Sequence, residues 1–381
     1  MYTLRRLDIL LAAAGGGLGL LWPSWIAGSL ALPLLWSATG SRTGAMLIVL
    51  LHQLAASRGL PHGSAVFFGP QTSWWFGYGL WLAAALLTAL PYGIFWSRNA
   101  VRKSLGLLLA LALHAASPVG WSHPISGVGD ILPGAGIWGV ALVFLTWGIF
   151  PLFRRILIIP ALFYLPLATA YQPATAAGIA GMDTHFHQLA SGSADYLAQY
   201  ERLSFVRDLA HGLGSNQVLV LPETIIGNLT PAAQDLLSRS EKELSQKHSV
   251  ILVGAEIPLT QGRYLNALIP LGDPSGQPIV QHVPVPVSMW RPWGQIGAQA
   301  RPYAAPSVYA GKLIGRVEAA ICYEQLLAWP MLRIVQDKPD VLVAASNLWW
   351  ARDTSIPAIQ TATMHSWARL AGIPLVTARN F

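Results

Sequence analysis

Three apolar segments in the C-terminal half of the chain each end in polar residues of the types that carry out catalysis. Glu223 follows residues 218–222, Cys322 follows residues 317–321, and Asn347 follows an apolar segment that begins at Val341. Ligands bind beyond the carboxyl ends of strands in open α/β sheets, so these residues are predicted to gather at one sheet edge. A thiolate is a strong nucleophile, and a buried carboxylate can take its proton and return it to a leaving group. The pattern therefore predicts nucleophilic catalysis with Cys322 as nucleophile and Glu223 as general base.

Cys322 is the single cysteine of the 381-residue sequence, so a disulfide within the chain is excluded. A strand-to-helix turn at Cys322 is expected to place the thiol near the amides of a helix N-terminus, which lowers a thiol pKa. Taken alone, a cysteine is more often a small buried apolar residue, and Leu-Pro-Glu is usually a turn with an exposed carboxylate. The alternating strands around Glu223 and Cys322 favour a site over both alternatives.

The elements that would position these residues alternate between strands and helices after about residue 172. Strands are expected at 178–184, 217–221, 249–257, 264–270, 279–287, 341–345 and 373–378, with two more within 312–322. Helices are expected at 194–213, 231–247, 325–336 and 355–370. Thr230 and Pro231 are typical of a helix N-cap and first position, and the GDPSG sequence at 272–276 is typical of a turn. This alternation indicates an α/β fold with helices covering the sheet faces.

The N-terminal part of the chain has a different composition, because charged residues are rare before residue 172. Over the whole chain, 53% of residues are hydrophobic and only 11% are charged, whereas soluble proteins have about 25% charged residues. A membrane-spanning helix needs about 20 apolar residues, and candidate spans are 9–22, 25–36, 46–56, 74–96, 105–115, 136–150 and 157–171. We therefore expect a transmembrane helical domain of about seven spans over 1–172 and an α/β domain over 173–381.

The basic residues predict how the spans are oriented. With seven spans and a cytoplasmic N-terminus, the cytoplasmic segments contain Arg5, Arg6, Arg42, Arg98, Arg102, Lys103, Arg154 and Arg155. The outer loops contain little more than Arg58. This asymmetry agrees with the positive-inside rule, and an odd number of spans places the α/β domain in the periplasm, on the outer face of a bacterial inner membrane. The net charge of +7 does not indicate nucleic-acid binding, because no recognition motif or aromatic-interleaved basic stripe accompanies it.

Four segments carry a resemblance to a known family: VLVLPETIIG at 218–227, RYLNALIPLGDPSG at 263–276, EAAICYEQLLAWPMLR at 318–333 and DVLVAASNLWWARDTSIPAIQ at 340–360. With the apolar N-terminal region, they make the chain similar to the nitrilase superfamily, and within it to the apolipoprotein N-acyltransferases. The chain most resembles the TraB-type conjugal transfer proteins. This resemblance implies a carbon–nitrogen hydrolase domain with a nitrilase-like α-β-β-α sandwich.

The resemblance also implies roles for individual residues. It places Glu223 at the general base, Cys322 at the nucleophile and Glu324 at a carboxylate that supports the site. The residues expected to bind substrate are Asn347, Trp350, Tyr323 and His282.

The family's third triad member, a lysine, is absent from the corresponding position. Aligning residues 279–289 places Gln281 at the lysine and Met289 at a second glutamate. The lysine stabilises the tetrahedral oxyanion, and glutamine donates a hydrogen bond without carrying a charge. Gln281 is therefore the remaining candidate for the catalytic set, with His282 or Lys312 as alternative sources of a cation.

Two functions remain open on these grounds. The first is an acyltransferase or amidase that forms a thioester on Cys322 and serves plasmid conjugal transfer, and the second is a catalytically silent membrane scaffold of a conjugation apparatus. A transporter is a third hypothesis, which lacks paired charges within the spans. The expected partners are membrane lipid, a lipoprotein or conjugation-apparatus proteins, without direct nucleic-acid contact. No cofactor or metal is expected, because His185 and His187 have no third ligand beside them.

Overall fold

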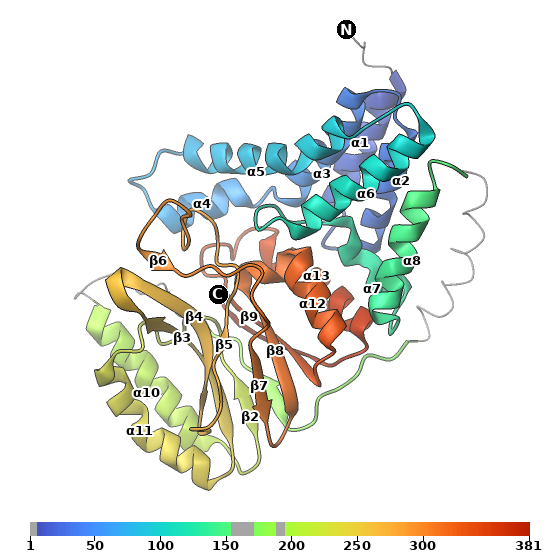
Figure 1. The fold of residues 1–381 in the computed structure, drawn as a ribbon. Helices are drawn as coiled ribbons and strands as arrows, with labels where there is room; N and C mark the ends of the chain where they lie inside the picture. The colour runs from blue at the N-terminus through green and yellow to red at the C-terminus, as the bar shows by residue number, and fades with distance from the viewer. Residues whose placement is uncertain (1–5, 154–170, 188–194) are drawn as a thin grey trace. The chain divides into compact units, whose positions relative to one another are not determined.

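The computed structural model describes residues 6–153, 171–187 and 195–381 (Figure 1). Contacts within the chain define two compact units. Unit 1 comprises Met1–Pro173, Leu326–Gln336 and Trp350–Gly372, and unit 2 comprises Ala174–Gln325, Asp337–Trp349 and Ile373–Phe381.

Unit 1 is helical. Its described elements are α1 (Arg6–Leu20), η1 (Ile26–Ala31), α2 (Leu32–Ala38), α3 (Arg42–Ala56), α4 (Leu60–Phe68), α5 (Trp75–Ile94), α6 (Ala100–Ala116), η2 (Pro124–Gly127), α7 (Val128–Ile131), α8 (Gly136–Ile149), nearly all of α12 (Ala328–Asp337), and α13 (Ile356–Ala371). Helices α1 and α3 approach closely through glycines: a Cβ at Gly15 would lie 2.7 Å from the Ile48 carbonyl oxygen, and one at Gly19 would lie 2.4 Å from that of His52. Side chains larger than hydrogen would therefore separate the two helices.

Helix α13 packs within unit 1 although it lies far from the other helices in sequence. A Cβ at Gly129 of α7 would overlap the Ser366 carbonyl oxygen of α13, so the two backbones are in direct contact. The Trp22 indole N–H also donates to Thr363 Oγ1 at 3.1 Å. These contacts explain why the last long helix of the chain groups with the N-terminal helices.

The expectation of about seven membrane spans is not confirmed by the helix lengths. Among the described helices, α5 alone is long and apolar enough to cross a membrane, and the count rises to two if Pro124–Ile131 and Gly136–Ile149, bent by 119°, form one span. Helix α3 has 15 residues, which corresponds to about 22 Å and is shorter than the hydrocarbon core of a bilayer. Of the candidate span at 157–171, residues 157–170 lie outside the described residues.

Unit 2 contains two β-sheets. The first has the strand order β1 (Ile179–Gly181), β2 (Val218–Val220), β3 (Val250–Pro258), β4 (Arg263–Leu271), β5 (Ile279–Val280), with β6 (Gly297–Ala298) also pairing with β4. The second has the order β10 (Leu375–Asn380), β9 (Val341–Asn347), β8 (Gly315–Ile321), β7 (Val308–Gly311). Strands β1, β2 and β3 are parallel, as are β8, β9 and β10. Within each parallel set the carboxyl ends therefore share one edge.

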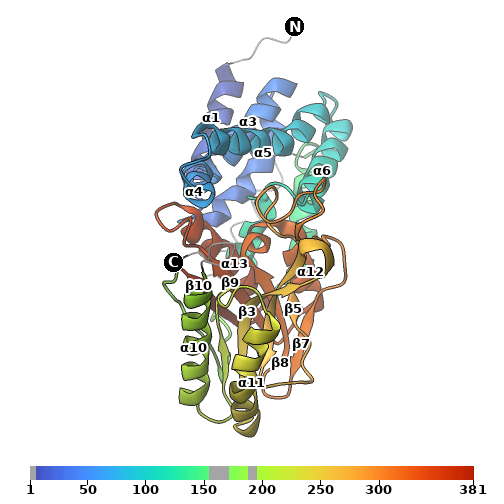
Figure 2. The same cartoon turned by 90° about the vertical axis from the view of Figure 1, so that its left-hand side faces the viewer.

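Apolar layers hold unit 2 together. One buried cluster joins residues of both sheets, including Val220 and Leu252 from the first and Val317 and Val343 from the second. A second cluster joins the first sheet to α10 (Tyr196–Gly212) and α11 (Pro231–Gln246) (Figures 1 and 2). Unit 2 thus contains an α-β-β arrangement, which confirms the predicted α/β class and three of the four layers of the predicted α-β-β-α sandwich. The two remaining helices of this half, α12 and α13, group mainly with unit 1.

The predicted elements agree with the structure best where the sequence is strongly patterned. The Thr230 side chain accepts from the Ala233 N–H at 3.2 Å, which confirms the predicted N-cap of α11. The strand predicted at 279–287 is wrong after Val280. The N–H groups of His282 and Val283 donate to Glu324 and not to a neighbouring strand, and the prolines at 284 and 286 have no N–H. The strand pair predicted within 312–322 is displaced, since residues 312–314 form the turn between β7 and β8.

Candidate active site

The three sequence-predicted strand ends meet in unit 2. Glu223 follows β2 of the first sheet, whereas Cys322 follows β8 and Asn347 ends β9 of the second. Strands β8 and β9 are parallel neighbours in which Ile321 pairs with Ala345, so Cys322 and Asn347 emerge at the same edge. The Asn347 N–H donates to Glu223 Oε2 at 2.9 Å and thereby connects the two sheets.

Glu223 is buried, with 3% of its surface exposed, and is held by hydrogen bonds from several sides. Its Oε1 accepts from Asn266 Nδ2 at 2.6 Å, and its side chain is also hydrogen-bonded to the Cys322 thiol. Burial raises the pKa of Glu223 to about 6, and the bonds from Cys322, Asn347 and Asn266 oppose that rise. A carboxyl group with a pKa near neutrality is suited to accept and return a proton.

Cys322 opens the short 3-10 helix η5 (Cys322–Leu326) in a strained backbone conformation, with φ at 50°. Residues other than glycine seldom adopt this left-handed region, and such strain clusters at functional sites. The backbone N–H groups of Tyr323 and Asn347 both hydrogen-bond to the sulfur.

The expected lowering of the thiol pKa is wrong in its net direction. Burial raises the pKa of Cys322 well above its usual value, and the charge of Glu223 raises it further. The Tyr323 and Asn347 amides act in the expected direction but are outweighed. The resting thiol is therefore neutral, and a base must remove its proton during any reaction.

Gln281 occupies the position expected for the lysine and belongs to a chain of amide hydrogen bonds. Its Nε2 donates to the Ile321 carbonyl at 2.8 Å, and its Oε1 accepts from Asn266 Nδ2 at 2.8 Å. A carbonyl oxygen can only accept, so the bond to Ile321 determines which end of the Gln281 amide is nitrogen. Asn266 Nδ2 must then donate to both Gln281 and Glu223. Two neutral amides thus connect Glu223 to the residue before Cys322.

Glu324 serves as an anchor for the backbone. Its Oε1 accepts from the N–H groups of His282 at 2.7 Å and Val283 at 3.1 Å. Its Oε2 accepts from the Ile321 N–H at 2.9 Å. Burial raises the pKa of Glu324 to about 7 despite these three bonds. The carboxyl group fastens the chain after β5 to the end of β8, which makes Glu324 a positioning residue.

The residues predicted to bind substrate are divided between the two units. The Asn347 side chain bonds to Thr224 and Asn380 within unit 2, and the His282 ring lies 3.3 Å from Ser307 Oγ. Trp350 belongs to unit 1, where its ring packs edge-on against Phe67. Substrate binding by Asn347, His282, Tyr323 and Trp350 stays a prediction.

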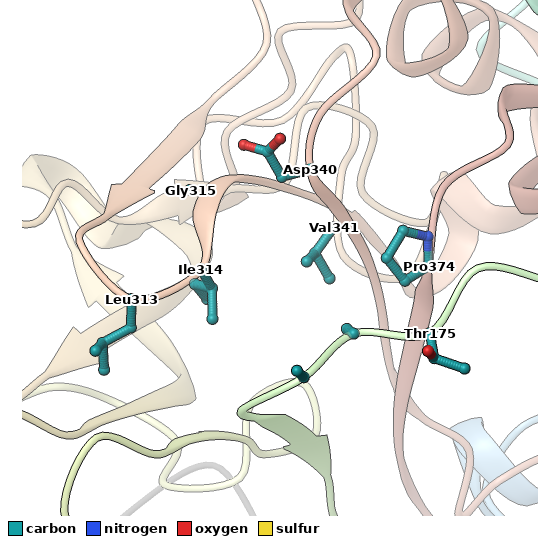
Figure 3. Close-up of a pocket in the computed structure, with 9 residues that line it drawn as sticks. Thr175, Leu313, Ile314, Gly315, Asp340, Val341 and Pro374 are labelled. Atoms are coloured by element: carbon teal, nitrogen blue, oxygen red, sulfur yellow. The ribbon is translucent and has the colours of Figure 1, made fainter.

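Lys312 cannot replace the missing lysine. It lies exposed in the turn before β8, whereas Cys322 follows the other end of that strand. A cavity of about 440 Å³ also lies at the Lys312 end of β8, lined by residues that include Thr175, Leu313 and Asp340 (Figure 3). Glu223 and Cys322 do not line this cavity, which is therefore separate from the candidate active site.

Two polar residues of the site escaped the sequence reasoning. The first is Asn266, which is buried within the apolar strand β4. The second is Glu256 on β3, whose pKa is raised to about 7 by its burial and by the negative charge of Glu223. The available signal was the same for both: a polar residue inside an apolar strand needs a partner when buried. Among the described residues, no three His, Cys, Asp or Glu side chains are grouped so that they could hold a metal ion.

Comparisons with known proteins find a curated relative and solved structures that are similar to parts of the chain. Apolipoprotein N-acyltransferase of Haemophilus ducreyi is 26% identical over 191 residues, which are 44% of this chain and 37% of that protein. An amidase of known structure from Nesterenkonia sp. is 14% identical, with a TM-score of 0.36, over 55% of this chain and 79% of the amidase. No protein-family model matches the chain.

Two further relatives match almost the whole chain. A probable conjugal transfer protein TraB of Sinorhizobium fredii is 35% identical over 366 residues, covering 92% of each chain. The conjugal transfer protein TraB of Agrobacterium fabrum is 33% identical over 405 residues, covering 98% of this chain and 92% of that one. The chain therefore belongs to the family of TraB conjugal transfer proteins.

Proposed function

We propose that the protein is a membrane-bound acyltransferase or amidase that forms a thioester on Cys322 and serves conjugal transfer. The observation that carries this proposal is the buried hydrogen bond between Glu223 and the Cys322 thiol. A base in contact with a neutral thiol is the arrangement that nucleophilic catalysis needs. The names of the relatives, conjugal transfer protein and apolipoprotein N-acyltransferase, supply the setting and the reaction class.

The reaction begins when Cys322 sulfur attacks the carbonyl carbon of an acyl ester or amide. Glu223 takes the thiol proton and returns it to the departing alcohol or amine, which leaves an acyl thioester on Cys322. An acceptor amine, or water, then attacks the thioester carbonyl and gives a proton to Glu223, which returns it to the sulfur as the thioester bond breaks.

The Tyr323 N–H, next to the sulfur, is suited to stabilise the oxyanion of both steps. Gln281 Nε2 carries a second hydrogen besides the one donated to Ile321. It supplies a neutral donor where a lysine would supply a charge, so slower chemistry is expected.

A membrane location supports a lipid acyl donor. The chain has a mean hydropathy of +0.46, and α5 has the length and composition of a span. We assign residues 1–172 to a membrane domain and residues 173–381 to a periplasmic domain, as the distribution of basic residues favours. A membrane lipid then donates the acyl group, and a lipoprotein or a protein of the conjugation apparatus accepts it.

The test compares Cys322→Ala with a control, Ser238→Ala, which changes an exposed side chain on α11. Conjugal transfer frequency is measured in cells that lack the wild-type gene, with membrane levels of each variant checked by immunoblot. Cys322→Ala should abolish transfer at unchanged protein level, whereas Ser238→Ala should not affect it. Mass spectrometry of the wild-type protein should also find an acyl group on Cys322.

The replacement of the lysine by Gln281 favours a second candidate, a silent membrane scaffold of the conjugation apparatus. A scaffold needs the fold but not the thiol, so Cys322→Ala would support full transfer. That result, together with cross-links to conjugation proteins, would reject the enzymatic proposal and support the scaffold.

A further inference from the structure

The loop at residues 284–307, between β5 and β7, exposes large apolar side chains to solvent. Trp293 is 76% exposed, Ile296 is 65% exposed and Tyr303 is 59% exposed. Exposed apolar residues are ordinary when they are scattered singly. Here three large apolar side chains are exposed within eleven consecutive positions of the loop, 293–303, and this concentration needs an explanation.

The charged residues along this part of the sequence all have one sign. Residues 274–317 contain no aspartate or glutamate, and the loop itself carries Arg291 and Arg301, both exposed. Arg263 of β4, also exposed, donates from Nε to the Gln295 carbonyl at 3.1 Å and so adds a third cation beside the loop. The surface around Trp293 is therefore basic and aromatic.

The loop is held in place by its backbone. The Ala298 N–H donates to the Met289 carbonyl at 2.8 Å, and the Gln299 N–H donates to the Tyr264 carbonyl at 2.9 Å. Strand β6 at Gly297–Ala298 also pairs with β4. These bonds fasten the backbone on both sides of residues 290–296, the segment that carries the exposed Trp293 and Ile296.

We propose that the 284–307 loop inserts Trp293 and Ile296 into the interfacial region of an anionic phospholipid bilayer. Indole and phenol rings partition into the headgroup region because one end is apolar and the other polar. Arg291, Arg301 and Arg263 match the negative phosphates that surround such rings. This charge complementarity favours a lipid surface over a protein partner.

The inference rests on the proposed membrane-bound function and adds a route for its lipid substrate. The Arg301 N–H donates to the His282 carbonyl at 2.8 Å, and the His282 N–H donates to Glu324, which also binds Ile321 beside Cys322. Both ends of the loop thus meet next to the candidate nucleophile. A lipid held at the loop would present its acyl ester close to that site.

The experiment attaches an environment-sensitive nitrobenzoxadiazole label to single cysteines of the full-length protein. In a Cys322→Ser background, the labels are placed by Trp293→Cys, Ile296→Cys and, as control, Leu313→Cys. Leu313 is a suitable control because it is 41% exposed in another loop of unit 2, next to Lys312. Each protein is reconstituted into phosphatidylcholine vesicles with and without phosphatidylglycerol.

We expect the labels at 293 and 296 to show blue-shifted emission and quenching by spin-labelled lipid. Iodide should quench these two labels several-fold more weakly than it quenches the label at 313. The difference should grow with phosphatidylglycerol and shrink in the Arg291→Glu, Arg301→Glu double variant. If the protein is in the membrane and the labels at 293 and 313 are equally accessible to iodide, the inference is wrong and the proposed function stands. If the protein does not fractionate with membranes, the proposed membrane-bound function fails and this inference fails with it.

Discussion

Replacing Asn266 by alanine should destabilise the protein in a manner that reports directly on the amide chain of the site. Asn266 Nδ2 is the donor shared by Glu223 Oε1 and Gln281 Oε1, at 2.6 and 2.8 Å. Its Oδ1 is buried and has no hydrogen-bond partner within the part of the chain that the structure describes. Truncation therefore removes no other side-chain bond, and the cost comes from two acceptors left buried without a donor.

The magnitude follows from the cost of unsatisfied polar groups. Each buried acceptor that loses its partner costs about 1–3 kcal/mol, with the higher values for charged groups. With two such acceptors, Asn266→Ala should therefore lower the free energy of unfolding by about 2–6 kcal/mol. The exposed Asn228 serves as control, because surface substitutions usually change stability by less than about 0.5 kcal/mol.

The loss should increase with pH. The pKa of Glu223 is raised from 4.5 to about 6, so the wild-type protein loses stability as pH rises through this range. The Asn266 bond opposes the rise in pKa. Without it, the pKa of Glu223 moves higher, and each additional unit costs about 1.4 kcal/mol once the group is ionised.

The assay is urea unfolding of the detergent-solubilised protein, followed by the fluorescence of its 16 tryptophans at pH 5 and pH 8. Asn266→Ala should unfold at lower urea than wild type at both pH values, with the larger difference at pH 8. A change no larger than that of Asn228→Ala would refute the shared hydrogen bonds, and a difference that is larger at pH 5 would refute the electrostatic reasoning.

Three further predictions concern the same site. The raised pKa of Cys322 predicts slow alkylation by iodoacetamide at pH 7 and a rate that still rises in the alkaline range. A rate plateau near neutrality would contradict this prediction. A Cβ at Gly254 would lie 2.0 Å from the Pro222 carbonyl oxygen, whereas one at Gly212 meets nothing within 4 Å. Thermal unfolding should therefore show that Gly254→Ala loses about 1–3 kcal/mol of stability, and that Gly212→Ala loses none. Gln281→Lys should lower the pKa of both Glu223 and Cys322 and raise the alkylation rate at pH 7; an unchanged rate would mean that the new cation lies outside the site.

The sequence predicted the α/β class and the strand ends of the site because both depend on local patterns. Residues 218–220 and 341–345 are apolar runs, and the structure buries every one of these side chains in the two sheets. Polar residues directly after such runs must lie at strand ends, so Glu223 and Cys322 could be singled out without coordinates. The short strand β5 shows the limit of this reasoning, because the backbone after it donates to the Glu324 carboxylate, a distant partner that no local pattern reveals.

The environment of the site could not be predicted from local patterns. Asn266 reaches Glu223 across two strands of the sheet, and the register of β3 and β4 is needed to know that it faces inward. The direction of the Cys322 pKa depends on how completely Ile321, Asn347 and Glu223 exclude water, which is a property of the packed state. The apolar N-terminal half shows the same limit, because an apolar composition does not determine where each helix breaks.

The geometry of the site bears on whether the protein is an enzyme or a scaffold. Burying Glu223 without a cation raises its pKa, and holding Cys322 at a φ of 50° strains the backbone. Both features reduce stability, and a scaffold would gain from replacing them with an apolar pair or a glycine. Strain of this kind persists where function requires it. The amides of Asn266 and Gln281 connect Glu223 to the residue before Cys322 without the lysine charge, which supports the proposal of slow chemistry at this site.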